Sequence, residues 1–441
     1  MSSPSPLLLP EARDLAARLA EPRWGPYPRP HYDGFSVPNV AATALKSLTG
    51  APPPSGSRLP PLASVYPRTE GAQTVVVFLV DSFGWNVLSG LESHARTTTE
   101  RAVASKVLPC AWPLTTVFPS TTSSALLSLS TGTAPGTHGV VGYTEYFPAW
   151  GTILNTLKMT PSWGGPRDLA AGQGFRPSDL LPVPTVFRAT SPTLALTKEE
   201  FGGTAFTKAL YDGAPFQGYI SLSDLAMHLG TALGKPAAQR PRLIWAYWDL
   251  LDAVHHVHGP TQELATRELT HLFLAMASVA SALTPEQREG VSFLVTGDHG
   301  QIAADPARAF PVHEDPALLS LLRRPPSGER RAAFLEAREG RRDDLERYLR
   351  ARETDGWVTF TVREVIEGGL LGPGPHHPEL ADRLGDFLVL PPPGGALYYR
   401  PPGRRGPEEH FLRGAHGGLT VDELLVPLVS TTFDQMAGWD L

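Results

Sequence analysis

The stretch that decides the fold is VVVFLVDSFG at residues 75–84, an apolar run that ends abruptly in an aspartate. This run predicts a strand over Thr74–Val80 that is buried on both faces, followed at Asp81 by a polar turn and a helix. Similar runs at Arg242–Trp248 and Val291–Thr296 also end in Asp or His residues. The repetition of strand, polar loop and helix indicates a parallel α/β sheet.

The acids and histidines that follow these strands form a candidate metal site. Parallel sheets bind ligands at the carboxyl ends of their strands, so we expect side chains from separate runs to meet at one edge. Six possible nitrogen or oxygen ligands are Asp81, Asp252, His256, Asp298, His299 and His416. A catalytic ion takes about three protein ligands and keeps open positions, so six ligands suit two ions.

Each motif has a simpler interpretation when it is taken alone. In DLLDAVHHVHGP, Asp252 and His256 share one face of a helical turn, which could be an exposed polar turn. Asp81 could be an ordinary helix N-cap, and His416 in GAHGG could be a loop histidine without a ligand. Asp298-His299 is harder to explain without a ligand, because polar groups at the end of a buried apolar run cost free energy unless they are paired or bind a metal ion. The joint placement after separate strands favours the metal site.

A candidate nucleophile lies in FPSTTSSALLSLSTGTAPGTHG, residues 118–139. Pro119 can end the preceding strand, and Ser120 or Thr121 can cap a helix that begins there. Thr122 would then lie in the first helical turn, near backbone N–H groups that favour an anion. A metal-bound threonine hydroxyl ionises more easily and can attack phosphorus. The alternative is a capped helix with no catalytic role.

Composition restricts the class of protein. A hydrophobic fraction of 41% over 441 residues is enough for a large core, and a net charge of −6 argues against a surface that coats nucleic acid. The single cysteine, Cys110, excludes an intrachain disulfide and a multi-cysteine zinc site. No run has the length of a membrane span, and the N-terminus has no signal-peptide pattern. We therefore expect a cytoplasmic protein that does not bind membranes; its oligomeric state is not indicated.

The domain organisation is expected to be one large catalytic domain with additions. Residues 1–70 are rich in proline and predict an arm that packs on the core, with a short helix at Val40–Leu48. Residues 71–441 predict the catalytic domain. Within it, residues 145–240 suggest a cap over the site, and residues 303–382 a charged insertion with an exposed helix pair. The core is expected to resume near Asp386–Leu390 and to include Leu424–Val429.

These residues resemble the alkaline phosphatase superfamily, and most of all its type I phosphodiesterase/nucleotide pyrophosphatase branch. The resemblance covers residues 73–145, 242–302 and 410–430. It rests on the threonine nine residues before Thr-Gly in STGTAPGTHG, on the Asp-x3-His-x2-Gly-Pro spacing at Asp252–Pro260 and on Asp-His-Gly after a strand. The fold that it implies is an α/β/α sandwich with a mostly parallel central sheet and inserted cap segments.

The resemblance also implies roles for the site residues. One ion would be held by Asp81, Thr122, Asp298 and His299, and the other by Asp252, His256 and His416. Two divalent cations are implied, and zinc is the ion we expect. In the implied mechanism Thr122 attacks phosphorus, the alcohol or nucleotide leaves, and water hydrolyses the phosphothreonine.

The chain departs from the branch at two positions. Nucleotide pyrophosphatases usually carry Asn three residues after the nucleophile, where this chain has Ala125. A second phosphate-binding Asn also has no counterpart, because Tyr143-Thr144 occupies that region; Tyr143 is a candidate substrate-binding residue instead.

The sequence thus predicts a metal-dependent hydrolase of small phosphate esters or nucleotides, of the phosphodiesterase/nucleotide pyrophosphatase kind. Alternatives within the superfamily are a phosphomonoesterase, a phosphonate hydrolase and a phosphoryl-group transferase. A non-catalytic binding platform is disfavoured, because every ligand and the nucleophile are present.

Overall fold

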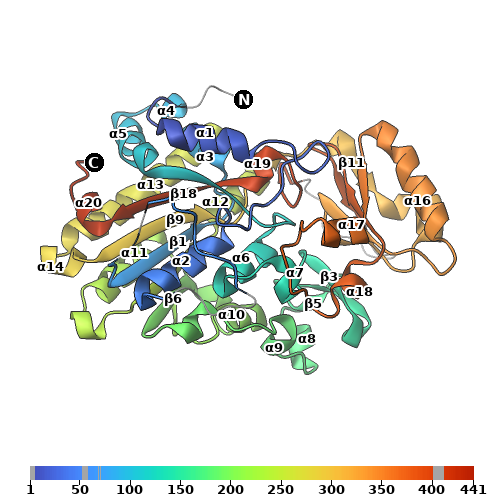
Figure 1. Cartoon of the computed structure of the whole chain (residues 1–441), viewed down its shortest axis with the longest axis horizontal. Helices are drawn as coiled ribbons and strands as arrows, with labels where there is room; N and C mark the ends of the chain where they lie inside the picture. Colours follow the sequence, from blue (N-terminus) through green and yellow to red (C-terminus); the bar gives the residue numbers. More distant parts are fainter. Residues whose placement is uncertain (1–4, 52–57, 68, 70, 401–411) are drawn as a thin grey trace.

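The computed structural model describes residues 5–51, 58–67, 69, 71–400 and 412–441. A seven-stranded sheet of order β2-β18-β9-β1-β8-β6-β7 forms the centre of the larger part of the molecule (Figure 1). Its strands are β1 (Thr74–Val80), β2 (Ala111–Thr115), β6 (Thr193–Lys198), β7 (Phe216–Tyr219), β8 (Leu243–Trp248), β9 (Val291–Gly297) and β18 (Leu425–Thr432).

Most of this sheet is parallel. Strands β9, β1, β8, β6 and β7 run in one direction, and β18 is antiparallel to both of its neighbours. Strand β1 lies in the interior, where Val77 is in register with Trp245 on one side and Leu294 on the other. All seven residues of β1 are buried, as expected of a strand covered on both faces. The predicted α/β fold with a mostly parallel central sheet is therefore confirmed.

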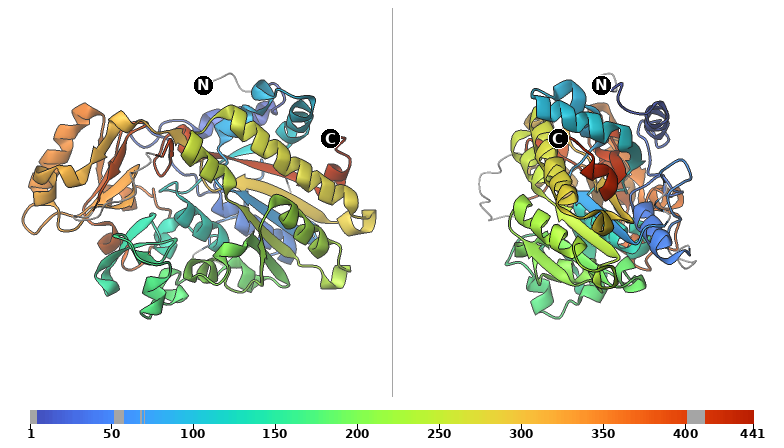
Figure 2. Two further views of the ribbon diagram at one scale, coloured as in Figure 1. Left: turned by 180° about the vertical axis from the view of Figure 1, so that it is seen from behind. Right: turned by 90° about the vertical axis from the view of Figure 1, so that its left-hand side faces the viewer.

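Helices cover both faces of the central sheet. The long helix α13 (Gln262–Ala282) packs with α5 (Thr98–Val107), α11 (Leu222–Leu233) and α20 (Phe433–Ala437) on the face turned to the viewer at the left of Figure 2. Helices α2 (Pro38–Thr49), α6 (Thr122–Thr131) and α10 (Ala205–Leu210) pack on the opposite face. None of the described helices is long and apolar enough to cross a bilayer.

A second sheet stands beside the first, at the right of Figure 1. Its seven strands are paired antiparallel in the order β14-β15-β13-β12-β3-β4-β5. They are β3 (Thr144–Phe147), β4 (Thr152–Asn155), β5 (Thr160–Pro161), β12 (Ser327–Glu329), β13 (Ala332–Leu335), β14 (Val358–Thr361) and β15 (Phe387–Leu390). Two segments almost 200 residues apart in the chain thus build one sheet, and the β12–β3 pairing joins them.

The boundaries of the two expected insertions need correction. Only the start of the 145–240 segment lies in the second sheet; β6 and β7, from the same segment, are parallel strands of the central sheet. Strand β6 is mostly buried beside β8, whereas β7 is a four-residue edge strand of which Tyr219 alone is buried; the scattered Pro and Gly of this segment concealed both strands. Conversely, Asp386–Leu390 does not return to the central sheet, because β15 pairs with β13 and β14 of the second sheet.

The prediction of an exposed helix pair within residues 303–382 is wrong for the first of the two helices. Residues 327–335 form the β12–β13 hairpin, because Ala332–Leu335 is a fully buried apolar run that pairs with β15. The second half is helical: α16 (Arg342–Ala351) carries pairs of opposite charges one turn apart, such as Arg342 with Glu346. Its apolar side, Leu345 and Leu349, packs in a small core of its own.

The first 70 residues contribute two helices to the described structure. Helix α2 contains the predicted Val40–Leu48, while α1 (Pro10–Leu19) was not predicted. Helix α1 packs against β2 and buries Ala12 and Leu15. Part of the proline-rich segment, residues 1–4, 52–57, 68 and 70, lies outside the described residues.

Candidate active site

Three of the six candidate ligands are placed by neighbouring strands. Asp81 follows β1 and Asp298 follows β9, and the last residues of these strands, Val80 and Gly297, are in register. Asp252 lies on α12 (Leu250–His258), which begins two residues after β8, the other neighbour of β1. The carboxyl ends of parallel strands meet at one edge of the sheet, so the three carboxylates converge there.

The most deeply buried group consists of Asp81, Asp298 and His299. His299 Nε2 lies 3.4 Å from Asp81 Oδ1 and 3.7 Å from Asp298 Oδ2. Both of these carboxylate oxygens are buried without a hydrogen-bond partner among the described residues. Such unpaired oxygens are costly unless a cation completes them. The three residues can hold a metal ion, since their ligand atoms lie within 4.8 Å of one another.

The second group opens toward a cavity. His256 Nε2 lies 3.2 Å from Asp252 Oδ2, and His416 Nε2 lies 3.9 Å from Asp252 Oδ1. Asp252, His299 and His416 form the second set whose ligand atoms lie within 4.8 Å of one another. The rings of His299 and His416 are stacked 3.8 Å apart, so His299 lies at the junction of the two groups.

The loop that carries His416 is attached to the start of the nucleophile segment. Ser120 and Gly417 form an isolated antiparallel bridge, and Ser120 Oγ donates to the carbonyl of Gly418 over 2.7 Å. These bonds explain how a histidine near the C-terminus reaches a site formed by strands in the first 300 residues.

All three histidines are oriented by backbone carbonyl oxygens. Nδ1 of His256 lies 2.9 Å from the oxygen of Gly414, Nδ1 of His299 3.1 Å from that of Gly300, and Nδ1 of His416 3.1 Å from that of Ser120. Each Nδ1–H can donate to its carbonyl, which directs Nε2 at the carboxylates. This orientation is typical of histidines that bind metals.

The electrostatics of the site also favour cations. Burial, with Asp298 and Asp252 nearby, raises the pKa of Asp81 well above its ordinary value, and burial raises the pKa of Asp298 to about 7. Burial lowers the pKa of His299 to about 4 and, with His299 beside it, that of His416 to about 3. The site therefore combines poorly compensated carboxylates with neutral imidazoles, and this donor set fits divalent metal ions.

Asp252 and His256 behave as a pair. Burial by itself would raise the pKa of Asp252, but the hydrogen bond and charge of His256 reverse the effect and lower it. Burial likewise opposes the charged form of His256, and Asp252 outweighs it, so the pKa of His256 is raised.

Thr122 lies beside both groups, as the first residue of α6. Its Oγ1 is 3.1 Å from His299 Nε2. Thr121 holds the predicted N-cap position, yet its side chain does not cap the helix; its hydroxyl donates to Glu329 Oε1 over 2.5 Å. The N-terminus of α6 is therefore left without a side-chain cap next to the hydroxyl, where an anion would be favoured.

Two cavities adjoin Thr122. The larger, of about 540 Å³, is lined by Asp252, His256 and His416 and extends between the two sheets to Glu329, Arg330, Tyr398 and Tyr399. The smaller, of about 130 Å³, is lined by aromatic side chains, among them Phe201, Phe206, Tyr211 and Tyr247. Thr122, Tyr143 and Leu157 line both cavities, so the hydroxyl stands between them.

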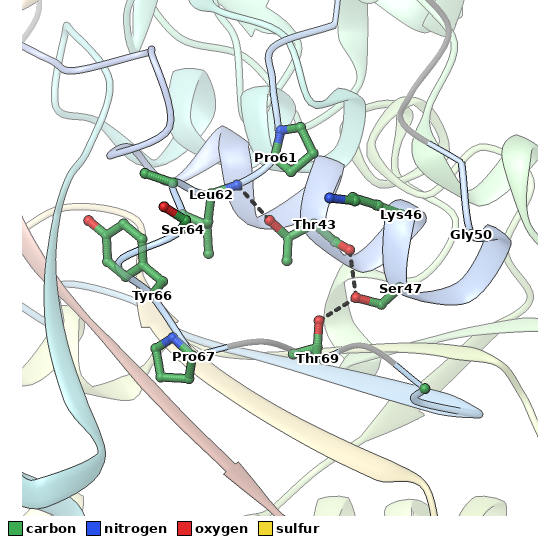
Figure 3. A pocket seen from close by; sticks show the side chains of 12 residues that line it. Thr43, Lys46, Ser47, Gly50, Pro61, Leu62, Ser64, Tyr66, Pro67 and Thr69 are labelled. Carbon is green, nitrogen blue, oxygen red and sulfur yellow. Dashed lines mark hydrogen bonds between the residues drawn. The ribbon is translucent and has the colours of Figure 1, made fainter.

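A further cavity, of about 700 Å³, lies away from these residues, between α2 and residues 61–67, 69 and 71 (Figure 3). Its polar groups are engaged with one another: Thr43 Oγ1 accepts from the backbone N–H of Leu62, and Ser47 Oγ donates to the carbonyl of Thr43. Among its described lining residues Lys46 alone is charged. These described lining residues offer no acid or imidazole for catalysis.

Sequence reasoning missed several residues that surround the site. Tyr247 donates a hydrogen bond to Asp81 Oδ2, and Gln301 Nε2 lies 3.3 Å from Asp252 Oδ1. His255 is buried, with Nδ1 3.0 Å from Ser82 Oγ. Gln301 follows Asp298-His299-Gly300 closely enough that its position in sequence was a usable signal, whereas Glu329 had none.

The fold and the site together define a hydrolase of the alkaline phosphatase superfamily. The chain belongs to the type I phosphodiesterase/nucleotide pyrophosphatase family, whose model matches residues 75–419. The predicted class of enzyme is thereby confirmed, and members of this family use two divalent metal ions. Curated protein sequences contain no match to the chain.

Solved structures with this fold include murine and human ectonucleotide pyrophosphatase/phosphodiesterase 5. The murine protein is 16% identical with a TM-score of 0.56, over 80% of this chain and 87% of its own. An inactive variant of the murine protein in complex with AMP is 15% identical, with a TM-score of 0.55 over 81% and 87%. The human protein is 14% identical, with a TM-score of 0.53 over the same shares. At these identities the likeness concerns the fold.

Proposed function

We propose that this protein is a two-metal phosphodiesterase that works through a phosphothreonine on Thr122. The observation that carries the proposal is the position of the Thr122 hydroxyl. It lies at the start of α6, 3.1 Å from His299 Nε2, beside two groups of carboxylates and imidazoles that can hold metal ions.

The ligands divide into a deep and an open set. Asp81, Asp298, His299 and Thr122 would hold the deep ion, and Asp252, His256 and His416 the open one. The side chains of Asp298 and His299 are 0% exposed, whereas those of Asp252 and His256 are 18% and 20% exposed, so water reaches the open set. Zinc is the ion we propose, because its preferred ligands include imidazole and carboxylate. Bound ions would lower the pKa of the hydroxyl and screen the negative charge on phosphorus-bound oxygens.

The reaction proceeds in two displacements. Thr122 Oγ1 loses its proton to solvent and forms a bond to phosphorus, while the bond from phosphorus to one ester oxygen breaks and that alkoxide leaves as the alcohol after taking up a proton. Water then attacks the same phosphorus, the bond to Oγ1 breaks, and Thr122 regains its proton. The product is the phosphomonoester of the remaining organic group. The N-terminus of α6 favours the negative charge of the phosphoryl oxygens in both steps.

A diester is the substrate class that the cavities favour. A diester has two organic groups, and two cavities meet at Thr122. The small aromatic cavity suits a flat apolar group, and the larger polar cavity suits the other group. A nucleotide or another small organic phosphate fits this description, and AMP is the ligand of the murine variant.

Substitution of the nucleophile tests the mechanism. In zinc-replete buffer, Thr122→Ala should lower kcat on bis-p-nitrophenyl phosphate by at least ~10³-fold, because the variant lacks the hydroxyl that forms the covalent intermediate. Thr231→Ala, which removes an exposed hydroxyl on α11, is the matched control and should keep wild-type turnover. A chelator should abolish activity, and zinc should restore it. Unchanged turnover of Thr122→Ala would show that the nucleophile is assigned wrongly.

The same assay separates the alternatives. A higher kcat/KM on bis-p-nitrophenyl phosphate than on p-nitrophenyl phosphate is the result expected of a diesterase, and the reverse order would favour a phosphomonoesterase. A cytoplasmic location stays a prediction that rests on the sequence, with its single cysteine, Cys110, as support.

A further inference from the structure

The second sheet brings one carboxylate into the larger cavity, that of Glu329 at the end of β12. Gly328 makes this approach possible. Gly328 has a φ of +91°, which a residue with a side chain rarely adopts. A Cβ added to Gly142 would lie only 2.6 Å from the Cα of Gly328. Two glycines in contact thus let the hairpin reach the loop that follows the nucleophile helix.

Glu329 touches three segments of the active site. Its Oε1 accepts hydrogen bonds from Thr121 Oγ1 over 2.5 Å and from the backbone N–H of Tyr143 over 2.8 Å. Its Cβ packs on Gly417, the residue after His416. A Cβ added to Gly417 would lie 2.6 Å from the Cβ of Glu329. One oxygen of this carboxylate is therefore fixed beside the nucleophile.

The other oxygen, Oε2, makes no hydrogen bond to the residues that the structure describes, and the side chain is partly exposed to the cavity. Burial raises the pKa of Glu329 to about 7, because its two hydrogen bonds and the charge of Arg330 offset the loss of water only in part. Arg331 does not compensate it either, because Arg331 is paired with Glu423 at 3.0 Å. Glu329 is thus a fixed and poorly compensated acceptor within the proposed substrate cavity.

We propose that Glu329 determines specificity: its Oε2 accepts a hydrogen bond from a donor on the organic group of the substrate, most strongly from an ammonium group and less strongly from a hydroxyl. This inference rests on the phosphodiesterase function proposed above. The same cavity is lined by Tyr143, Tyr398 and Tyr399, whose rings can contact a cation. Charge-assisted hydrogen bonds are about twice as strong as neutral ones, which sets the order of preference.

Three diesters that differ in one atom or group test the proposal. They are the 2-aminoethyl, 2-hydroxyethyl and ethyl esters of 4-nitrophenyl phosphate. All three share the 4-nitrophenolate leaving group and the single negative charge of the phosphodiester. In the wild-type enzyme kcat/KM should fall in that order. In Glu329→Gln, the ratio of kcat/KM for the aminoethyl ester to that for the ethyl ester should fall about tenfold, mainly through KM, because the charge is lost while an oxygen remains for Thr121.

Glu339→Gln is the matched control, because Glu339 is an exposed glutamate of the same part of the chain outside the cavity. It should keep the wild-type ratio. Equal kcat/KM for the three esters in the wild type, or an unchanged ratio in Glu329→Gln, would overturn the specificity role. Equal losses on all three esters would also overturn it and would indicate that Glu329 only positions Thr121. If the wild-type enzyme with zinc cleaves none of the esters, the proposed function itself fails.

Discussion

At the scale of single residues, His138 shows how burial fixes a protonation state. It is fully buried, its Nδ1 accepts from the backbone N–H of Val140 over 3.1 Å, and its Nε2 lies 2.9 Å from Ser128 Oγ. Nδ1 must therefore be unprotonated, and Nε2–H donates to Ser128. Burial lowers the pKa of His138 to about 3. The folded protein thus keeps this imidazole neutral at pH values where the unfolded chain protonates it.

This residue should make the protein less stable in mild acid. The pKa in the folded state lies below the unfolded value of about 6.5, so the unfolded chain binds more protons and the stability that a neutral His138 contributes is lost as the pH falls through 6.5 toward 3. Between pH 7 and pH 5 the loss should be about 2 kcal/mol. Urea titrations of wild type and His138→Gln, both with chelator, should show a smaller pH dependence in the variant. His271→Gln, which removes an exposed histidine, should follow the wild-type curve; identical curves for all three proteins would contradict the assignment.

At the scale of elements, the β12–β13 hairpin joins the two sheets. Arg331 follows β12 and is 2% exposed at its side chain, and it makes paired hydrogen bonds of 3.0 Å to the two carboxylate oxygens of Glu423 on α19 (Val421–Leu424). Glu423 in turn accepts from the backbone N–H of Gly418, two residues after His416. One buried ion pair therefore fixes both the hairpin that carries Glu329 and the loop that carries His416.

Breaking this ion pair should be costly, because it leaves a charge buried without a partner. Arg331→Met should lower the free energy of unfolding by about 3–5 kcal/mol. The double variant Arg331→Met/Glu423→Gln removes both charges and should be clearly more stable than the single variant. Denaturant titrations measure both. Equal stability of single and double variants would show that the ion pair does not control the packing of the hairpin.

At the scale of the whole molecule, the site is a point where four distant parts of the chain meet without charge balance. Asp81 and Asp298 follow two neighbouring strands of the central sheet, and Asp252 lies on α12, which follows a third. His256 compensates Asp252, but His299 and His416, which burial keeps neutral, do not balance the charge of Asp81 and Asp298. Two divalent ions would remove this repulsion, so metal binding and folding should be coupled.

Metal removal should therefore destabilise the fold as well as abolish activity. Free zinc at about 1,000 times its Kd should stabilise the folded state by about 4 kcal/mol per site, which is a rise in Tm of several degrees. Differential scanning calorimetry with chelator and with zinc measures the change. Asp298→Asn should show a smaller zinc-dependent shift because it loses one ligand charge, and an equal shift in that variant would contradict the assignment of Asp298 as a ligand.

Much of the central sheet was predictable, because strands buried on both faces leave continuous apolar runs. The predicted Thr74–Val80 is β1, and Arg242–Trp248 and Val291–Thr296 match β8 and β9 within one residue. Strand β6 was missed because its apolar run is short and follows Pro192, and β7 because this four-residue edge strand contains a glycine and is mostly not buried. The β12–β13 hairpin was misread as helical, because a run of Arg and Glu around Ala332–Leu335 suggested a solvated helix.

The sequence by itself determined the chemistry available to this protein. Its apolar runs must form buried strands, and acids, histidines and a threonine follow the ends of such runs. The geometry of a parallel sheet places residues at these positions along one edge. The tertiary structure alone decided how the site is completed. Glu329 reaches Thr121 because two segments almost 200 residues apart pair in the second sheet, and His416 reaches Asp252 because Ser120 bridges to Gly417. Contacts between segments so distant in the chain depend on packing and leave no local pattern in the sequence.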